Sequence, residues 1–339
     1  MKTSNYVFRL ALMAALVLPG AAVSAEEPDV VKPEMYFTDC WTGPCFAKDP
    51  DVARFNNKYL MYYTTRRETK GIVVGIAESD DLVNWTKVGM MLPDAPYEKN
   101  GLGAPGVIVQ GGKLHIFYQI YGNGPKDAIC HAVSEDGLHF ERNPENPIFA
   151  PTGDWTVGRA IDADAVVFGD RMLLYAATRD PGMKVQMVVV AGAPLDSGFG
   201  RGAWTQLHDG PILKPQLPWE KKCIEAPTLV ERNGRLYMFY AGAYNNEPQQ
   251  VGVAVSEDGI HFERMSDEPL LPNGKPDEWN ASESGHPGAF VDTDGQMYLF
   301  FQGNRTNGKD WYLSKMRIAW EEDKPYLVRP RDGQVFRLR

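Results

Sequence analysis

The sequence has few cysteines, few histidines and a deficit of basic residues. Only 4 of the 339 residues are Cys and 6 are His, and no second Cys/His pair accompanies the Cys-x4-Cys spacing near the N-terminus, which argues against a zinc site. Lys and Arg number 35 against 44 Asp and Glu, a net charge of −9. An acidic surface repels phosphate backbones and anionic lipids, so nucleic acid and membrane surfaces are excluded as partners. With 43% hydrophobic and 23% charged residues, the composition also excludes disorder.

A long apolar run is also missing. The apolar residues 10–17 and 21–23 are separated by Pro19 and Gly20, well short of the roughly 18 to 20 residues that a membrane span needs. Lys2 and Arg9 precede the apolar part, and small residues suited to cleavage end at Ala25. This pattern predicts a secretory signal over residues 1–25. We therefore expect a periplasmic or secreted mature chain, residues 26–339, with no membrane partner after cleavage.

Removal of the signal makes the net charge more negative, and export allows the cysteines to form disulfides. Without Lys2 and Arg9 the chain keeps 33 basic residues against 44 acidic ones, a net charge of −11. Disulfides form outside the cytoplasm, so Cys40 and Cys45 could form a local one. Cys130 and Cys223 are expected to be small buried apolar residues.

Internal repetition is the most informative feature. The stretch from Asp49 aligns without a gap on the stretch from Asp162, and further copies begin at Ala104, Ala226 and His286, the last with one extra residue. The starts are 55, 58, 64 and 60 residues apart. Five units are therefore present.

Each unit predicts short antiparallel strands. An apolar strand, a turn with Asn, Gly or Asp and an aromatic second strand form a hairpin signal. In three units a third strand then ends at a Ser, and a polar turn leads to an aromatic residue that opens a fourth strand. Four antiparallel strands in each of five units predict an all-β, five-bladed β-propeller. We expect residues 26–339 to form this single domain.

The unit starts are expected to form a ring, because the first strand of each propeller blade lines the central channel. Crowded strands favour small or apolar side chains, yet three carboxylates and one imidazole occur at or beside these starts: Asp49, Asp162, Glu225 and His286. Oxygen ligation of a metal such as Ca²⁺ and glycoside hydrolysis by an acid and a base both suit such a set. A third anion would raise the pKa of the acid.

Four motifs give the chain a resemblance to family 43 glycoside hydrolases, which are five-bladed propellers. They are Lys48-Asp49-Pro50, Arg159-Ala160-Ile161-Asp162, Ile224-Glu225-Ala226-Pro227 and Ser284-Gly285-His286, spread over about residues 36 to 322. The resemblance implies that Asp49 is the general base and Glu225 the general acid, and that Asp162 tunes and positions the acid. It also implies that His286 faces the axis, where it often helps to hold a hydrated structural Ca²⁺; no cofactor is required for the reaction.

Some features leave alternatives open. The second blade reads Gly103-Ala104-Pro105-Gly106 where the family commonly has Trp-Ala-Pro-Asp, so an aromatic wall and a carboxylate are missing there. Asp51 and Asp164 follow the catalytic candidates by two residues, a step that keeps the same face of a strand, so either could face the channel instead. Glu283 is a conceivable substitute acid.

Four further residues are candidates for substrate contact. Aromatic rings in loops can stack on sugars, and a guanidinium can bind hydroxyls or a carboxylate. The candidates are Trp41, Trp219, Arg179 and Arg305, and Trp279 is a further loop tryptophan of the same kind.

The expected function is that of a monomeric, exo-acting and inverting glycosidase. The resemblance suggests an α-L-arabinofuranosidase or β-xylosidase type of activity on plant or algal oligosaccharides or polysaccharides. One rival is a retaining fructoside-type enzyme, whose relatives read Asn-Asp-Pro, Arg-Asp-Pro and Glu-Cys at the corresponding places. The other is a carbohydrate-binding propeller without catalysis.

Overall fold

The computed structural model describes residues 1, 34–40, 45–66, 71–305 and 307–339. The predicted signal segment and Trp41 therefore lie outside the described residues, apart from Met1. The described residues from 34 to 339 form one compact unit. Among the described residues, helix is limited to four three-residue 3-10 turns, and none of the helices could cross a bilayer.

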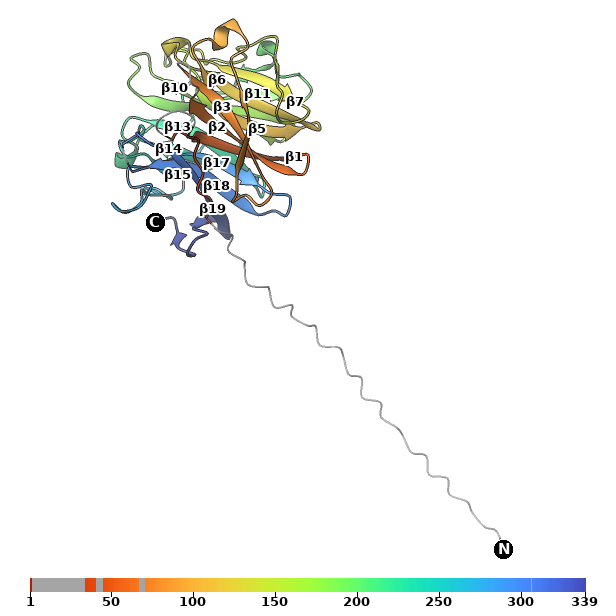
Figure 1. The fold of residues 1–339 in the computed structure, drawn as a ribbon, viewed down its shortest axis with the longest axis vertical. Helices are drawn as coiled ribbons and strands as arrows, with labels where there is room; N and C mark the ends of the chain where they lie inside the picture. The colour runs from red at the N-terminus through yellow and green to blue at the C-terminus, as the bar shows by residue number, and fades with distance from the viewer. Residues whose placement is uncertain (2–33, 41–44, 67–70, 306) are drawn as a thin grey trace. The chain divides into compact units, whose positions relative to one another are not determined.

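Five antiparallel sheets make up this unit (Figure 1). Blade 1 contains β1 (Lys48–Phe55), β2 (Lys58–Arg66), β3 (Ile72–Ser79) and β4 (Thr86–Met91). Blade 2 contains β5 (Leu102–Gln110), β6 (Lys113–Ile120), β7 (Ile129–Ser134) and β8 (Glu141–Arg142). Blade 3 contains β9 (Ile161–Phe168), β10 (Arg171–Arg179), β11 (Gln186–Pro194) and β12 (Thr205–Gln206).

Blades 4 and 5 complete the set. Blade 4 contains β13 (Ile224–Arg232), β14 (Arg235–Gly242), β15 (Gln250–Ser256) and β16 (Glu263–Arg264). Blade 5 contains β17 (Glu283–Val291), β18 (Met297–Asn304), β19 (Tyr312–Glu321), β20 (Lys324–Val328) and β21 (Val335–Phe336). Four consecutive antiparallel strands per blade confirm the predicted five-bladed propeller, and blade 5 adds a short fifth strand.

The first strands form a closed ring, in which β1 lies beside β5 and β17, and β9 and β13 continue the series between them. A strap from the N-terminal side pairs with the last blade. Phe37 and Leu313 exchange backbone hydrogen bonds of 2.9 and 2.8 Å, and Trp311 donates to the carbonyl of Cys45 at 2.9 Å. Cys40 and Cys45, which the sequence left as a possible pair, form a disulfide within this strap. The backbone hydrogen bonds to blade 5 join this strap, which precedes blade 1, to the last blade of the ring.

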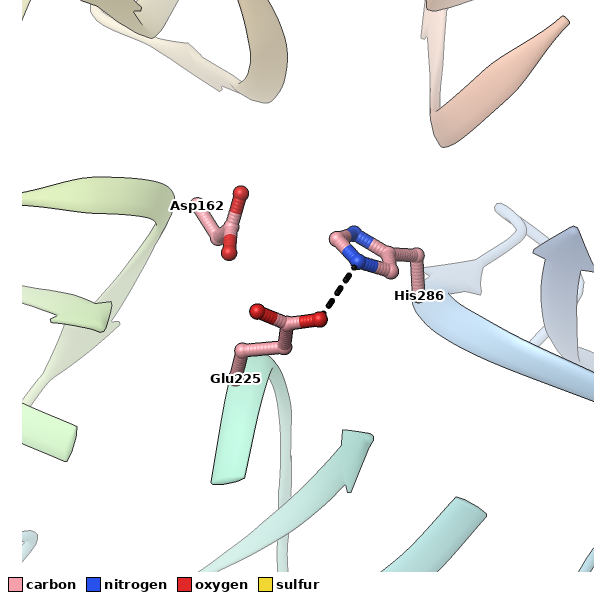
Figure 2. Close-up of side chains that lie close together, drawn as sticks. All are labelled: Asp162, Glu225 and His286. Carbon is pink, nitrogen blue, oxygen red and sulfur yellow. Dashed lines mark hydrogen bonds and ion pairs between the residues drawn. The ribbon is translucent and has the colours of Figure 1, made fainter. Parts of the chain in front are cut away.

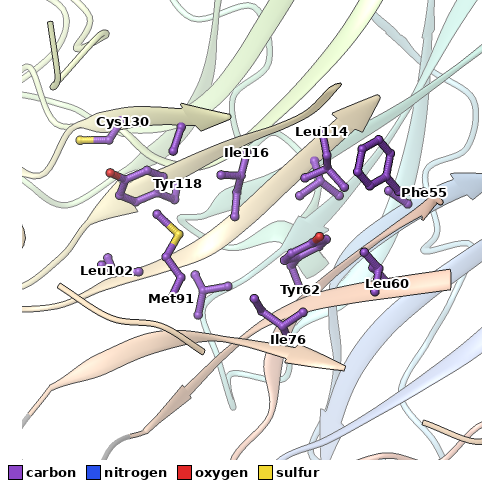
Figure 3. Packing of buried hydrophobic residues seen from close by; sticks show 14 of the residues in the cluster. Phe55, Leu60, Tyr62, Ile76, Met91, Leu102, Leu114, Ile116, Tyr118 and Cys130 are labelled. Carbon is purple, nitrogen blue, oxygen red and sulfur yellow. The ribbon is translucent and has the colours of Figure 1, made fainter. Parts of the chain in front are cut away.

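The core is divided among the seams between blades. Within the described residues, each seam has its own cluster of buried side chains. Figure 3 shows the cluster between blades 1 and 2, where Phe55, Leu60 and Tyr62 pack against Leu114 and Ile116. Face-to-face sheet packing explains why the strands carry apolar side chains on both faces. Cys130 and Cys223 are buried free thiols, as expected.

A backbone irregularity recurs at the start of every first strand. The pairing register shifts at this point in all five blades, as in a β-bulge. One non-glycine residue in each bulge has a positive φ, which L-residues rarely adopt. The five are Asp49 (51°), Ala104 (43°), Asp162 (52°), Ala226 (47°) and His286 (41°). They are the five unit starts aligned from the sequence.

Candidate active site

The pocket lies at the end of the ring where the first strands begin. It has a volume of about 290 Å³. The lining residues are Phe46, Lys48, Asp49, Thr64, Ile72, Gln119, Tyr121, Arg159, Ile161, Asp162, Arg179, Glu225, Tyr244, Asn245 and His286. Asp49, Asp162 and Glu225, from blades 1, 3 and 4, thus come together with His286 from blade 5.

The bulge positions these side chains because its backbone N–H donates a hydrogen bond to a side chain of the preceding blade. The backbone N–H of Asp49 donates to Oε1 of Gln302 at 2.9 Å, and that of Asp162 donates to Oε1 of Gln119 at 2.8 Å. Ala104 donates in the same way to Oγ1 of Thr64 at 2.7 Å. Because a side chain of the neighbouring blade holds the backbone, the ring residue's own side chain is left for the pocket.

Asp51 and Asp164 stabilise seams and line the narrow channel beyond this pocket, but not the pocket itself. Oδ2 of Asp51 accepts the backbone N–H of Val107 at 2.6 Å, and Oδ2 of Asp164 accepts that of Leu229 at 2.8 Å. Burial raises the pKa of Asp164 to about 7. Each carboxylate thus joins its blade to the next one, and the bulge breaks the two-residue alternation that left these residues as rivals of Asp49 and Asp162.

His286 lies between two carboxylates. Its Nδ1 is 2.9 Å from Oδ1 of Asp49, and its Nε2 is 3.1 Å from Oε1 of Glu225. Although burial opposes the charged imidazole, the two anions raise the pKa of His286 well above its usual value. Burial would likewise raise the pKa of Asp49, but the charge and hydrogen bond of His286 lower it, with Lys48 and Thr64 adding to the effect. Asp49 is therefore ionised.

Three nitrogen donors surround Glu225. Besides His286, Nε2 of Gln249 donates to Oε1 at 2.6 Å, and Nε2 of Gln186 donates to Oε2. The amide of Gln186 can take only this orientation, because its Oε1 accepts from Nε of Arg179 at 2.7 Å and from Nη1 of Arg159 at 3.4 Å, and a guanidinium cannot accept. Burial raises the pKa of Glu225, but the surrounding donors and charges outweigh it and lower the pKa.

Asp162 has the opposite environment. Its Oδ2 is buried and has no hydrogen-bond partner among the described residues. Burial raises the pKa of Asp162 to about 7, and Glu225 and Asp49 also raise it, against His286 and Arg159. We expected Glu225 to be the carboxyl with the raised pKa. That expectation was wrong for this arrangement, because the amides and His286 favour the ionised form of Glu225 and the proton is held more readily by Asp162.

A metal ion can be tested against the donor atoms. One ligand atom each from Asp162, Glu225 and His286 lies within 4.8 Å of the others (Figure 2). Calcium takes six to eight oxygen ligands, whereas this set offers two carboxylates and an imidazole whose nitrogens already contact Asp49 and Glu225. The set does not fit direct ligation of calcium.

Among the predicted substrate contacts that fall within the described residues, one lines the pocket; Trp41 lies outside them. Arg179 lines it, whereas Arg305 lies at a separate pocket with Trp279. Trp219 is not among the residues that line the active-site pocket: its indole N–H donates to the carbonyl of Asp267 at 3.0 Å, and its ring stacks on Tyr240. Trp219 therefore fixes its loop to blade 4.

Several residues in or beside the pocket were not assigned a role from the sequence. Lys48, Tyr244 and Asn245 line the pocket, and Gln186 and Gln249 do not line it but donate hydrogen bonds to Glu225. One signal could have revealed the two glutamines, because each lies where the third strand of its blade begins, at matched places in blades 3 and 4. Glu283 is fully buried behind the pocket, where it accepts hydrogen bonds from Gln302 and from the backbone of Asn246, both at 2.7 Å.

Comparison with known proteins relates the chain to carbohydrate-active enzymes. The profile of glycosyl hydrolases family 43 matches residues 42–324. Beta-1,2-mannobiose phosphorylase of Thermoanaerobacter sp. (strain X514) is 28% identical over 135 residues, which cover 35% of this chain and 42% of that protein. The match thus spans less than half the length of this relative.

Solved structures share the fold. A thermostable family-43 glycoside hydrolase superposes with a TM-score of 0.69 at 22% identity, covering 86% of this chain and 95% of the other. The α-L-arabinofuranosidase from Lactobacillus brevis gives a TM-score of 0.65 at 16% identity, covering 82% and 93%. At these identities the likeness concerns the propeller itself.

Proposed function

This chain belongs to glycosyl hydrolase family 43, and from this premise we propose that it hydrolyses a terminal glycosidic bond with inversion of configuration. The observation that carries the proposal is the meeting of Asp49, Asp162 and Glu225 in one pocket. Ionised Asp49 takes a proton from water as the water attacks the anomeric carbon. Glu225 gives a proton to the departing oxygen, and the bond between that oxygen and the anomeric carbon breaks.

Asp162 supplies the proton on which Glu225 depends. Asp162 holds a proton more readily than Glu225 does, and their oxygens lie within 4.8 Å of each other. Transfer between them through one bridging water makes Glu225 an acid when the leaving oxygen arrives. An imidazole ring lies between Asp49 and Glu225, which favours the wider separation of an inverting pair over the roughly 5 Å of a retaining pair.

The pocket favours action at a chain end. Its volume of about 290 Å³ is at the small end of the range for ligand pockets, roughly 300 to 1,000 Å³. The channel beyond it has a volume of only about 30 Å³. One sugar ring fits such a space. We infer an α-L-arabinofuranosidase or β-xylosidase type of activity on plant or algal oligosaccharides, prompted by the family and by the arabinofuranosidase among the structural relatives.

Phosphorolysis is the second candidate, because a phosphorylase is among the relatives and the cations Lys48 and Arg179 line the pocket. Ionised Asp49 favours water over phosphate as the nucleophile, since two anions repel each other. Formation of a sugar 1-phosphate in phosphate buffer, in place of free sugar, would establish phosphorolysis.

We also propose where the chain acts and in which state. The disulfide between Cys40 and Cys45 suits an exported chain, so we infer a periplasmic or secreted monomer that needs no metal for the reaction. N-terminal sequencing of the exported protein should begin at Glu26.

The test is a screen of aryl glycosides and oligosaccharides with product anomers observed by NMR. Inversion appears as a product of the opposite anomeric configuration. Asp49→Asn and Glu225→Gln should each reduce turnover by at least about 10³-fold, within the range attributed to general acid and base groups. If both variants cleave the selected glycoside as fast as the wild type, the chain is not the catalyst proposed here.

A further inference from the structure

The pocket contains more positive charge than the catalytic carboxylates explain. Three permanent cations line it: Lys48, Arg159 and Arg179. Arg159 forms an ion pair of 3.1 Å with Asp127, and both side chains are buried. Among the residues that the structure describes, no carboxylate forms an ion pair with Lys48 or Arg179. These two cations are held by neutral groups instead.

Lys48 acts on the catalytic carboxylates. Its Nζ donates to Oδ1 of Asn245 at 2.6 Å and lies 4.3 Å from the ring centre of Trp311. Its charge lowers the pKa of Asp49 and contributes to the lowered pKa of Glu225. The acidic cluster thus accounts for the charge of Lys48, and Arg179 is the cation that remains.

Arg179 is fixed in place while part of its guanidinium stays available. It ends β10 and is half-buried. Its Nε donates to Gln186, and the guanidinium carbon lies 5.1 Å from the ring centre of Tyr244. Within the described part of the chain, its two Nη atoms have no hydrogen-bond partner. A planar guanidinium oriented on two sides presents its remaining N–H groups as a fork that matches carboxylate or sulfate oxygens.

Partial burial of an unpaired cation is unfavourable, and an anionic group on the sugar offsets this cost better than hydroxyls do, because it supplies both the opposite charge and two acceptor oxygens for the guanidinium. We propose that the sugar bound in this pocket carries an anionic group, a carboxylate or a sulfate ester, and that Arg179 binds this group. The inference rests on the proposed glycoside cleavage and specifies its substrate class. Gln186 then links binding of the anionic group to catalysis by Glu225, because the same amide contacts Arg179 and Glu225.

Binding of matched sugars to the wild-type chain tests the proposal. Isothermal titration calorimetry would compare D-galacturonate and D-galactose 6-sulfate with D-galactose, and D-glucuronate with D-glucose, in 50 mM salt. We expect at least one charged member to bind about tenfold more tightly than its neutral counterpart, and the advantage to shrink at 500 mM salt. A preference for the uronates identifies the carboxylate, and a preference for the sulfate identifies the ester. Equal affinities throughout would overturn the inference.

Variants assign the effect to one side chain. Arg179→Gln should remove the preference for the charged sugar, and Arg179→Lys should keep part of it. Arg171→Gln is the matched control, because Arg171 starts the same strand on the exposed side and pairs with Asp170 at 3.3 Å; this variant should behave as the wild type. A charge preference that survives in a folded Arg179→Gln protein would contradict the assignment, and should that variant not fold, the salt dependence of the wild type still decides.

The two proposals fail separately. Cleavage of aryl glycosides is measured on the same preparations. If neutral glycosides are cleaved and charged sugars have no advantage, the anion site is refuted and glycoside cleavage stands. If charged sugars bind through Arg179 but no glycoside is cleaved, the anion site stands and the catalytic proposal is refuted.

Discussion

Replacing Gln186 by Glu should move the alkaline limit of activity. Gln186 donates from Nε2 to Oε2 of Glu225. In Gln186→Glu this donor becomes a second carboxylate, and two adjacent carboxylates cannot both ionise freely. The pKa of Glu225 should therefore rise, because its proton is now shared with the introduced group.

The magnitude follows from the charges around the introduced group. Two unit charges about 4 Å apart repel by about 4 kcal/mol at an effective dielectric constant of 20, or roughly three pKa units. Arg159 and Arg179 both donate to residue 186 and would neutralise part of the new charge. We therefore expect a rise of about one to two units.

The assay is the pH dependence of kcat/KM on the glycoside selected by the screen. In the wild type the raised pKa of Asp162, about 7, predicts that activity falls as the pH rises through about 7, since the proton destined for Glu225 is then lost. The charge added by Gln186→Glu opposes loss of the proton that Asp162 and Glu225 share, so the alkaline limb should move to higher pH by up to about one to two units. Gln206→Glu is the control, because Gln206 lies on the outer strand of the same blade and bonds only the backbone near Thr152 and His208. An unshifted alkaline limb in a folded Gln186→Glu enzyme would refute this reasoning.

Three further outcomes are expected. Asp49→Asn should reduce kcat by at least about 10³-fold with little change in Tm. Asp51→Asn weakens a seam between blades, so it should lower Tm and leave kcat within a few-fold of the wild type. The reverse pattern would mean that the two roles are exchanged. Gly288→Ala should cost at least about 2 kcal/mol in urea unfolding, since a Cβ would lie 2.0 Å from the carbonyl oxygen of Pro50, and Gly202→Ala, where nothing lies within 4 Å, should be neutral by comparison. Burial lowers the pKa of His131 to about 3 from its usual 6.5. As the pH falls below about 6.5, the unfolded chain therefore binds a proton that the folded chain does not, and stability is lost. His131→Gln should flatten this part of a plot of Tm against pH.

The sequence repeat predicted which residues meet in the site, but not which of their carboxyl groups has the higher pKa. Aligning the unit starts placed Asp49, Asp162 and His286 at matched positions, because the same bulge recurs in every blade and the sequence around it recurs with it. The pKa order of Asp162 and Glu225 could not be predicted in this way. It depends on Gln186 and Gln249, which are 39 and 24 residues from Glu225 in the chain and reach it only once blades 3 and 4 have folded and packed together.

The loop tryptophans show the same limit. Trp219 precedes blade 4 in the sequence, as a stacking residue would, but only the folded structure reveals that Gly242 and Gly252 leave the space its ring occupies, with an added Cβ at 2.3 and 2.8 Å from it. A fold-specific space between strands is not visible in local sequence. Aromatic residues in such loops are therefore poor guides to sugar contacts.

The bulge at each unit start separates the shape of the propeller from the identity of the residue it presents. The backbone at Asp49, Ala104 and Asp162 is held by a side chain of the preceding blade, so the ring makes little demand on what the bulged residue itself carries. Ala104 and Ala226 show that a methyl group suffices. At the three bulges held by such a hydrogen bond, the backbone conformation is thus set independently of the bulged side chain, and an acid, base or ligand introduced at Ala104 would leave intact the hydrogen bond that holds this backbone. A fold organised in this way can change its chemistry by single substitutions.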